Sequence, residues 1–372
     1  MPPVINTIET LLVDLPTIRP HKLSMTTMAC QTLVIVRMHH SDGVEGIGEG
    51  TTIGGLAYGP ESPESIKTNI DTYLAPLLVG QPSSNIQALR ARLNRHARGN
   101  AIAKSALETA LLDAQGKRLG LSVAELMGGA RQVHLPVLWT LASGDTQKDI
   151  DEALLRLEQH LHCDFKLKIG ANPVDQDVRH VAAIKEALGD RASIRVDINQ
   201  AWDEPTAVRG IQALQNAGID LIEQAIPARE HAGLIRLSQR FNVPMLADEA
   251  VQDAHDGLEL ATGGFSGAFA LKIAKSGGLY GVLELAHVAK AAGIGLYGGT
   301  MLEGSIGTAA SLHAWATQDD MAWGTEMFGP LLLKDDIVVE PLHYHAFGVD
   351  LPQGPGLGVT LDEDKLAHYA RK

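Results

Sequence analysis

The feature that most constrains the fold is a set of eight short apolar segments that alternate with helical stretches from about residue 131 onward. Segments this apolar are typical of strands in a parallel sheet that is covered on both faces. The stretch 205–215 has the helical pattern, and Asp203 before it is a suitable N-cap. Eight strand–helix units predict a (β/α)₈ barrel, with an open doubly wound sheet as the alternative. The expected strands are 137–143, 165–170, 193–199, 221–225, 244–250, 268–275, 293–299 and 321–327.

The chain before residue 130 follows a different pattern, in which strands come first and helices follow. Ser41-Asp42-Gly43 is a hairpin turn signal between two of the strands. This order favours an α+β domain. The expected strands are 8–13, 31–38 and 44–49, and the expected helices are 63–73, 85–96 and 101–119. We therefore predict a capping domain (1–130) with a lid loop near 50–60, a barrel (131–328), and a C-terminal segment (329–372) that packs back on the capping domain.

Composition excludes several classes of function. The 372 residues include 31 Lys and Arg against 44 Asp and Glu, so the net charge is −13, and only 4% of residues are aromatic. A nucleic-acid binder needs a basic surface and stacking side chains, so nucleic acid is not an expected partner. The longest uncharged run, 72–89, is broken by Pro76 and Pro82, so no membrane segment is expected. The start has no secretory pattern, which favours the cytoplasm.

Polar side chains recur where the expected barrel strands end. Such strand ends form the active-site face of a barrel. Asp197, Glu223, Asp248 and Lys272 follow one another at intervals of 24 to 26 residues, about one per strand–helix unit. Singly, each has an ordinary interpretation as a helix cap or a solvated lysine, but the joint pattern predicts one site. The whole set is Lys166, Lys168, Asp197, Asn199, Glu223, Asp248, Lys272 and Glu326.

Three carboxylates in this set predict a divalent metal site. Asp197, Glu223 and Asp248 would repel one another unless a cation lay between them, and hard oxygen ligands suit Mg²⁺ or Mn²⁺. Lys166 and Lys168 are two residues apart and so face the same side of a strand. We expect Lys166 and the metal to lower the pKa of Lys168 toward a value useful for a base. A metal with flanking lysines suits proton transfer at the carbon next to a carboxylate.

The strand-end set Lys-x-Lys, Asp-x-Asn, Glu-Gln, Asp-Glu and Lys resembles the muconate-lactonizing subgroup of the enolase superfamily. The segments VDLPTIRPHK (13–22), TTIGGLAYG (51–59), WTLASGD (139–145), FKLKIG (165–170) and YGGTMLE (297–303) extend this resemblance over nearly the whole chain. The resemblance implies a two-domain enzyme that closes the dicarboxylate cis,cis-muconate to muconolactone, in catechol degradation by the β-ketoadipate route. It also implies a Mn²⁺ or Mg²⁺ cofactor and a homo-octamer.

The resemblance assigns roles to individual residues. It implies that Lys168 is the acid/base and that Lys166 assists it, while Lys272 faces the substrate and Glu326 is the acid at the eighth strand. Gly54, Gly55 and Gly59 flank residues 56–58 and could serve as hinges of a lid. The expected substrate contacts are Ile53, Tyr58 and Asn199. Without the resemblance, an ordinary glycine-rich surface turn is an equal interpretation of this loop.

Two positions depart from the family pattern, and several alternatives stay open. Ala225 stands where the family usually has Pro, and Ala250 stands where it usually has Ser; neither is a ligand position. Within the superfamily, the same residues could serve a chloromuconate cycloisomerase, a racemase or a dipeptide epimerase. A metal-free Schiff-base aldolase that uses Lys168 belongs to another class, as does a barrel that only binds. Finally, His343 and His345 alternate as on a strand, which favours a solvated pair over a metal site.

Overall fold

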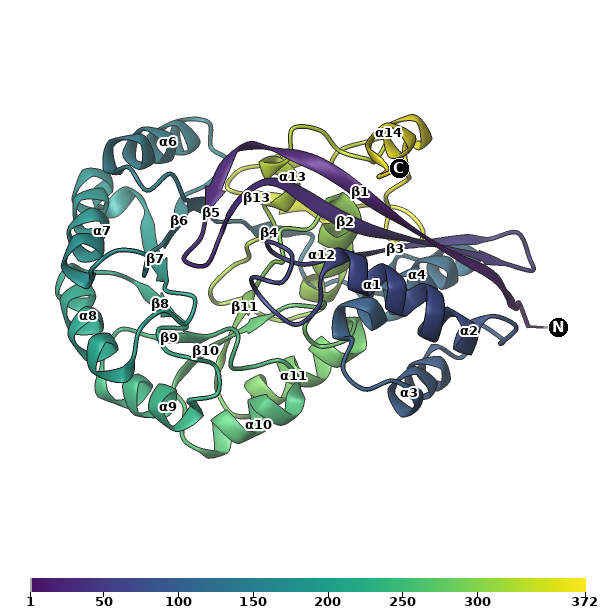
Figure 1. The fold of residues 1–372 in the computed structure, drawn as a ribbon, viewed down its shortest axis with the longest axis horizontal. Coiled ribbons are helices and arrows are strands. Elements are labelled where there is room, and N and C mark those ends of the chain that lie inside the picture. The colour runs from purple at the N-terminus through teal and green to yellow at the C-terminus, as the bar shows by residue number, and fades with distance from the viewer. Residues whose placement is uncertain (1) are drawn as a thin grey trace.

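The computed structural model describes residues 2–372, and its N-terminal part is an antiparallel meander (Figure 1). The strands are β1 (Ile5–Lys22), β2 (Thr27–His40) and β3 (Glu45–Thr51), in the order β1-β2-β3. Glycines in β3 let helix α4 (Ala101–Leu119) lie directly on the sheet. A Cβ atom on Gly46 would stand 2.0 Å from the Ala110 carbonyl oxygen, and a Cβ atom on Gly48 would stand 2.1 Å from the Ala106 carbonyl oxygen. The meander predicted from the sequence is thus present, with longer strands.

The helices of the capping domain follow the meander. Ser62 and Ser65 form a capping box at the start of α1, and Asn85 caps α3 through the Ala88 amide. Residues 63–78 are helical throughout but pass through a π-turn, η1. The bounds are α1 (Pro63–Asn69), η1 (Ile70–Leu74), α2 (Ala75–Leu78), α3 (Ile86–His96), α4 (Ala101–Leu119) and α5 (Val123–Leu126).

The second part is a curled parallel sheet whose strands are hydrogen-bonded in chain order, with helices around the outside (Figure 1). Its strands are β5 (Trp139–Leu141), β6 (Asp164–Lys168), β7 (Ser193–Asp197), β8 (Leu221–Glu223), β9 (Met245–Ala247), β10 (Gly267–Leu271) and β11 (Gly295–Gly298). The helices are α6 (Thr146–Glu158), α7 (Val174–Leu188), η2 (Gly189–Arg191), α8 (Glu204–Asn216), α9 (His231–Arg240), α10 (Ala254–Thr262), α11 (Leu279–Ala291) and α12 (Ser305–Ala316). Asp203 caps α8 through the Thr206 amide, as predicted.

The eighth expected strand, 321–327, is not a regular strand. Thr325 alone forms parallel bridges, one to Val137 beside β5 and one to Gly298 at the end of β11. Gly324 interrupts the extended run because its φ is +65°. Residues 323–326 therefore join the two edges of the seven-stranded sheet through a few backbone hydrogen bonds rather than a regular strand, and the barrel prediction holds with this correction.

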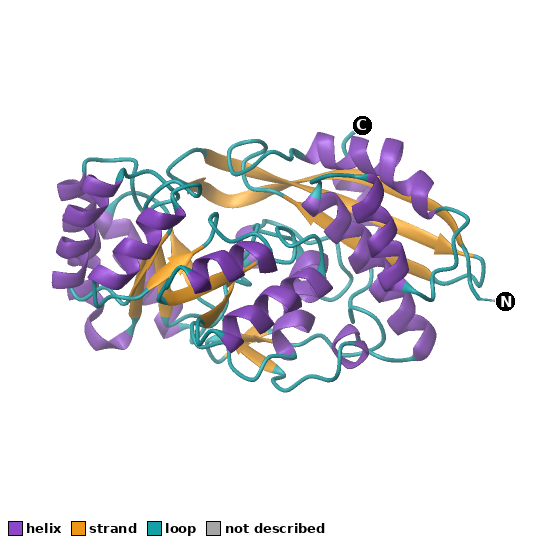
Figure 2. Ribbon diagram, turned by 90° about the horizontal axis from the view of Figure 1, so that it is seen from below, coloured by secondary structure: helices purple, strands orange, loops and turns teal. Residues whose placement is uncertain are grey.

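The C-terminal segment makes contacts with both parts of the chain. The hairpin of β12 (Tyr344–His345) and β13 (Gly348–Asp350) pairs with β4 (His134–Pro136), which precedes the barrel. Helices α13 (Gly329–Leu332) and α14 (Glu363–Tyr369) complete the segment. The Arg371 amide donates to the Leu12 carbonyl of β1, and the Arg371 guanidinium pairs with Asp14 at 2.7 Å. The long meander strands extend over one end of the barrel (Figure 2).

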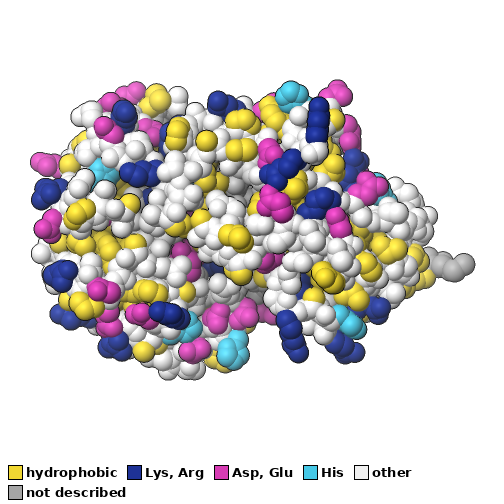
Figure 3. Space-filling view, in the orientation of Figure 1, with side chains coloured by type: hydrophobic (Ala, Val, Ile, Leu, Met, Phe, Trp, Pro, Cys, Tyr) yellow, Lys and Arg dark blue, Asp and Glu magenta, His cyan; other side chains and the backbone are white. Residues whose placement is uncertain are grey.

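The surface agrees with the charge argument. Figure 3 shows acidic and basic side chains interspersed over the visible face, without a basic stripe. In the described part of the chain, no helix is long and apolar enough to cross a membrane.

Candidate active site

The structure brings the strand-end residues together at the mouth of the barrel. Parallel register sets Lys168 opposite Asp197, and Asp197 opposite Glu223. One small cavity is lined by Lys168, Asn199, Glu223, Asp248, Lys272 and Glu326, together with Ile53 and Tyr58 from the capping domain. Lys166 and Asp197 lie beneath this lining and contact it. All ten predicted site residues therefore belong to one cluster.

On one side of the cluster, two lysines are fixed by carboxylates. The Lys166 ammonium lies 2.5 Å from Glu223 Oε2 and 2.7 Å from Glu326 Oε1. The Lys168 ammonium donates to Asp197 Oδ2 at 2.5 Å. Lys166 is fully buried, whereas the side chain of Lys168 is 11% exposed and reaches the cavity. Lys168 is therefore the lysine of this pair that a substrate can touch.

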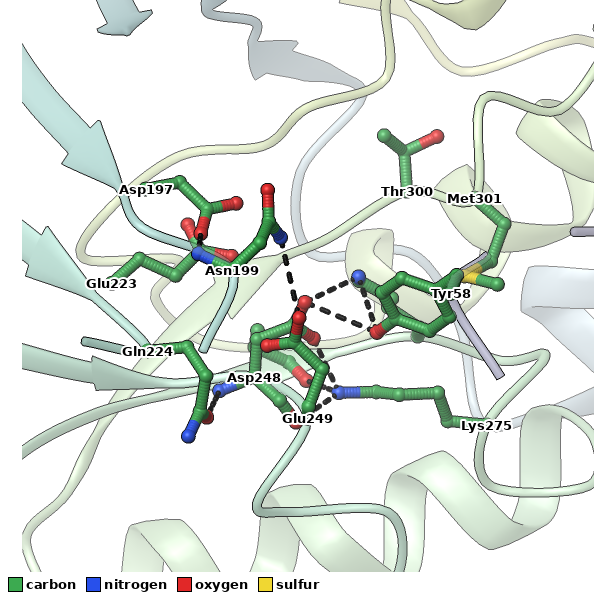
Figure 4. A network of polar contacts seen from close by, with 12 residues as sticks. Tyr58, Asp197, Asn199, Glu223, Gln224, Asp248, Glu249, Lys275, Thr300 and Met301 are labelled. Carbon is green, nitrogen blue, oxygen red and sulfur yellow. Dashed lines mark hydrogen bonds and ion pairs between the residues drawn. The ribbon is translucent and has the colours of Figure 1, made fainter. Parts of the chain in front are cut away.

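The other side of the cluster is built around Asp248 (Figure 4). Lys272 donates to Asp248 Oδ2 at 2.6 Å and to the Tyr58 hydroxyl at 2.9 Å. Lys275 donates to Asp248 Oδ1 at 2.6 Å and to the Asp248 carbonyl at 2.7 Å. Gln224, which has a φ of +36°, accepts from the amides of Asp248 and Ala250 and so fixes this strand end. Asp248 is thus held from three directions.

The sequence analysis missed Lys275 and Glu249 as members of the cluster. Lys275 is three residues beyond Lys272, at the end of the run expected as a strand, and that spacing was the available signal. Glu249 accepts from the Asn199 side-chain amide at 3.2 Å. Residues of the capping domain and of later loops also line the cavity without having been assigned a role; they are His21, Leu23, Thr140, Thr300, Leu302 and Phe328.

Without a metal cation, the charges of the protein do not lower the pKa of Lys168. Burial is the largest effect and acts to lower it, and Lys166 acts in the same direction, but the carboxylates of Asp197, Glu326 and Glu223 together outweigh both, so that the pKa lies above its ordinary value. The expected lowering would require a cation that takes Asp197 away from Lys168. Glu326 behaves in the opposite way: burial acts to raise its pKa, but Lys166, Lys168 and Lys272 bring it below the ordinary value. Glu326 is therefore held as a carboxylate.

The residues present fit a divalent metal by their chemistry. Five buried carboxyl groups, namely Asp197, Glu223, Asp248, Glu249 and Glu326, outnumber the four lysines that they face. Burial, followed by the charge of Asp197, raises the pKa of Glu223 well above its ordinary value, and burial with Asp248 raises that of Glu249 to about 7. Asn199 Oδ1 and Glu249 Oε2 are buried without a hydrogen-bond partner.

The ligand atoms of the three predicted metal ligands lie farther apart than they would around a bound metal ion. Among the described residues, the carboxylate oxygens of Asp197, Glu223 and Asp248 do not all lie within 4.8 Å of one another. The reason is visible in the contacts, because lysines hold the oxygens of Asp197 and Asp248. A cation would therefore have to displace lysine ammonium groups from two of its ligands.

The loop 53–59 closes the mouth. Gly54 and Gly55 have φ angles of +63° and +68°, which favour glycine, and Thr26 would stand 2.6 Å from a Cβ atom on Gly54. Ile53 and Tyr58 face the cavity, whereas Leu56 between them is exposed. The cavity is left with a free volume of about 10 Å³. This volume holds about one water molecule, so the loop is closed.

Ala225 and Ala250, the two residues that depart from the family pattern, are buried and form hydrogen bonds through their backbone. The Ala225 carbonyl accepts from the Trp202 amide, and the Ala250 amide donates to Gln224. Neither side chain lines the cavity.

Comparison with known proteins matches both parts of the chain. Residues 7–128 match the N-terminal domain of mandelate racemase / muconate lactonizing enzyme, and residues 148–365 match the enolase C-terminal domain-like family. Muconate cycloisomerase 1 of Pseudomonas putida is 59% identical over 371 residues, with 99% of each chain covered. The chloromuconate cycloisomerase of Pseudomonas sp. strain P51 is 46% identical over 367 residues, again with 99% of each chain covered. The muconate lactonizing enzyme of Pseudomonas fluorescens in complex with muconolactone superimposes with a TM-score of 0.99 at 58% identity, with 100% of each chain covered.

Proposed function

The chain belongs to the mandelate racemase / muconate lactonizing enzyme family, and on this basis we propose that it is a muconate cycloisomerase, which closes cis,cis-muconate to muconolactone. The single observation that supports this most strongly is the pair of lysine groups on opposite sides of one buried carboxylate cluster. Lys166 and Lys168 stand on one side, and Lys272 stands on the other. A planar diene dicarboxylate between them would meet an ammonium group from either face.

Asp197, Glu223 and Asp248 are the residues that would hold the metal, Mn²⁺ or Mg²⁺. When bound, this cation supplies a Lewis acid that offsets the negative charge developing on the substrate carboxylate, an effect worth several kcal/mol. Oxygen-only ligands favour these two metals over zinc.

Lys168 is the residue that carries the proton. Its ammonium group reaches the cavity, and it stands opposite Asp197 at the end of the neighbouring strand. As one substrate carboxylate adds across the double bond, Lys168 Nζ delivers a proton to the carbon next to the other carboxylate. In the reverse direction the free amine removes this proton.

Lys166 acts through its charge rather than by touching substrate, and Glu326, which lines the cavity, acts on Lys166. Glu223 and Glu326 fix Lys166 beneath the cavity, from where its positive charge lowers the pKa of Lys168. Because Glu326 is held as a carboxylate, we assign it the positioning of Lys166 and not proton donation. This role differs from the acid that the resemblance implies.

Lys272 and Tyr58 complete the site from the opposite side. Lys272 offers its ammonium group to a substrate carboxylate, and Tyr58 fixes Lys272 at 2.9 Å. The closed cavity is too small for a six-carbon dicarboxylate, so the loop 53–59 must open for entry. A neighbouring cavity of about 250 Å³ shares Leu23 and Lys168 with the lining of the site.

Chloromuconate conversion is the second candidate, since chloromuconate cycloisomerases are among the relatives, at lower identity. The Schiff-base aldolase alternative uses no metal and is disfavoured, because without a metal the carboxylates around Lys168 keep its pKa above the ordinary value, and the ammonium form lacks the lone pair that attacks a carbonyl. A homo-octamer and a place in catechol degradation stay predictions from the resemblance. The cytoplasmic location and the domain limits at residues 130 and 328 stay predictions from the sequence pattern.

The test is an ultraviolet assay of the diene. Protein freed of metal by a chelator should leave the absorbance of cis,cis-muconate unchanged, and added Mn²⁺ should start its loss. Lys148→Ala, which removes an exposed lysine on α6, should behave as the wild type. Comparison of kcat/KM on muconate and on a chloromuconate distinguishes the two candidates. Turnover by metal-free protein would contradict the proposal.

A further inference from the structure

Three histidines surround one aspartate at the surface, away from the barrel mouth. His134 Nδ1 lies 2.8 Å from Asp350 Oδ1, and His343 Nδ1 lies 2.7 Å from Asp350 Oδ2. His345 Nε2 lies 3.0 Å from both oxygens. Among the described residues, His134, His345 and Asp350 are the one set of three such side chains whose ligand atoms all lie within 4.8 Å of one another.

The fold brings these residues together from distant parts of the sequence. Antiparallel pairing of β13 with β4 sets Asp350 directly opposite His134. His345 reaches the same carboxylate from β12, through a tight turn in which Ala346 and Phe347 have φ angles of +46° and +64°. Positive φ angles at two successive non-glycine residues are unusual. The turn is held in place because the Phe347 amide donates to the His160 carbonyl at 2.9 Å.

The contacts of His134 suit a ring that carries either a second proton or a metal ion. Its Nε2 lies 3.4 Å from the Ala346 carbonyl, and its Nδ1 faces the Asp350 carboxylate. Both partners can only accept; an imidazolium donates to both, whereas a neutral imidazole has a single N–H to donate. If Nε2–H donates to the carbonyl, the lone pair of Nδ1 points at a carboxylate oxygen. This tautomer, with the outer nitrogen on a backbone carbonyl, is the usual arrangement of a metal-binding histidine.

We propose that His134, His345 and Asp350 form a second metal site, which takes a divalent transition metal such as Zn²⁺. Two imidazole nitrogens and one carboxylate suit this class of metal, whereas the oxygen-only barrel site suits Mg²⁺ or Mn²⁺. His343 donates to the same carboxylate from outside the set and orients it. The side chains of His134, His345 and Asp350 are 34%, 45% and 39% exposed, so a metal can enter and water can complete the coordination. The sequence analysis favoured a solvated pair for His343 and His345, and their side chains are 71% and 45% exposed; the proposal adds a metal ligand role for His345.

Such a site would tie the C-terminal hairpin to β4, which leads into the first barrel strand. Because a metal that binds only the folded chain stabilises it, bound Zn²⁺ should raise the melting temperature. The proposal is independent of the proposed function.

The experiment is calorimetric titration of the whole chain with Zn²⁺. The protein is first freed of metal and then saturated with Mg²⁺, so that the barrel carboxylates are occupied. The wild type should bind one Zn²⁺ per chain, and His345→Gln should bind it at least ~10-fold more weakly because one nitrogen ligand is lost. His287→Gln, which changes an exposed histidine on α11, is the matched control and should keep the wild-type isotherm.

Two results would overturn the site. If the Mg²⁺-saturated wild type takes up no Zn²⁺, or if His345→Gln binds it as the wild type does, the four residues are a hydrogen-bonded cluster only. Asp350→Asn provides an independent variant should His345→Gln fail to fold. A Zn²⁺-dependent rise in melting temperature should appear in the wild type and in His287→Gln and be absent from Asp350→Asn.

Discussion

Replacing Lys168 by alanine tests the proposed proton carrier most directly. In the proposed mechanism no other side chain carries the proton. Lactonization of muconate and exchange of the α-hydrogen of muconolactone in ²H₂O should therefore both fall by at least ~10²-fold, the range typical of a lost general acid/base. This loss corresponds to about 2.7 kcal/mol of barrier.

The contact between Lys168 and Asp197 gives the same variant two further properties. Lys168 Nζ lies 2.5 Å from Asp197 Oδ2, and Asp197 is buried. Removing one partner of a buried pair costs about 3–5 kcal/mol, so metal-free Lys168→Ala should unfold at lower urea than the metal-free wild type. Added Mn²⁺ should restore much of this stability, because the cation gives Asp197 a new positive partner.

The affinity for Mn²⁺ should not fall in Lys168→Ala. In the wild type the ammonium group competes with the cation for Asp197, and the variant removes this competitor. Calorimetry with Mn²⁺, urea unfolding with and without the metal, and mass spectrometry of ²H incorporation measure the three properties separately. The reasoning is wrong if Lys168→Ala exchanges the α-hydrogen at the wild-type rate while Lys272→Ala does not, since the base would then stand on the opposite face.

Four further changes follow from the same geometry. Asp248→Asn should weaken Mn²⁺ binding and turnover together, and normal binding of Mn²⁺ by calorimetry would remove Asp248 from the ligand set. Tyr58→Phe should raise KM for muconate more than it changes Mn²⁺ affinity, because the hydroxyl positions Lys272 and also donates to Asp248 Oδ2 at 3.1 Å; unchanged kinetics would return loop 53–59 to an ordinary surface turn. Lys166→Ala should leave a slower enzyme whose rate profile moves to higher pH. The positive charge of Lys166 lowers the pKa of Lys168 in the wild type, so removing that charge should raise the pKa; an unmoved profile would contradict this. Burial lowers the pKa of His313 from 6.5 to about 4. Between these pH values the unfolded chain takes up a proton that the folded chain does not, so the free energy of unfolding should fall by about 3 kcal/mol as the pH drops. Urea unfolding of His313→Gln should lack this part of the pH dependence.

Much of the site could be predicted because the barrel places like positions together. Asp197, Glu223 and Asp248 each follow an apolar strand, and parallel strands present their carboxyl ends at one edge. Once the strands were located, the clustering of these side chains followed from topology alone. The lid was predictable for a similar reason, since glycines at 54 and 55 provide the positive φ angles that its turn requires.

Other features depend on distances that no sequence pattern contains. Lys275 joins the cluster because the chain after β10 turns back toward Asp248. The sign of the pKa shift of Lys168 depends on the balance between burial and Lys166, which lower the pKa, and the surrounding carboxylates, which raise it. His134 and Asp350 are 216 residues apart, and only the pairing of β4 with β13 makes them neighbours.

Local patterns in the chain were enough to predict the order of strands and helices, the edge of the sheet that carries the chemistry, and the residue types gathered there. These features follow from apolar periodicity and strand ends. Folding was needed to show which lysine meets which carboxylate, that the irregular segment 323–326 closes the barrel, and that histidines from two strands share Asp350. Electrostatic and ligand interactions act over a few ångströms, so they depend on packing between segments distant in sequence.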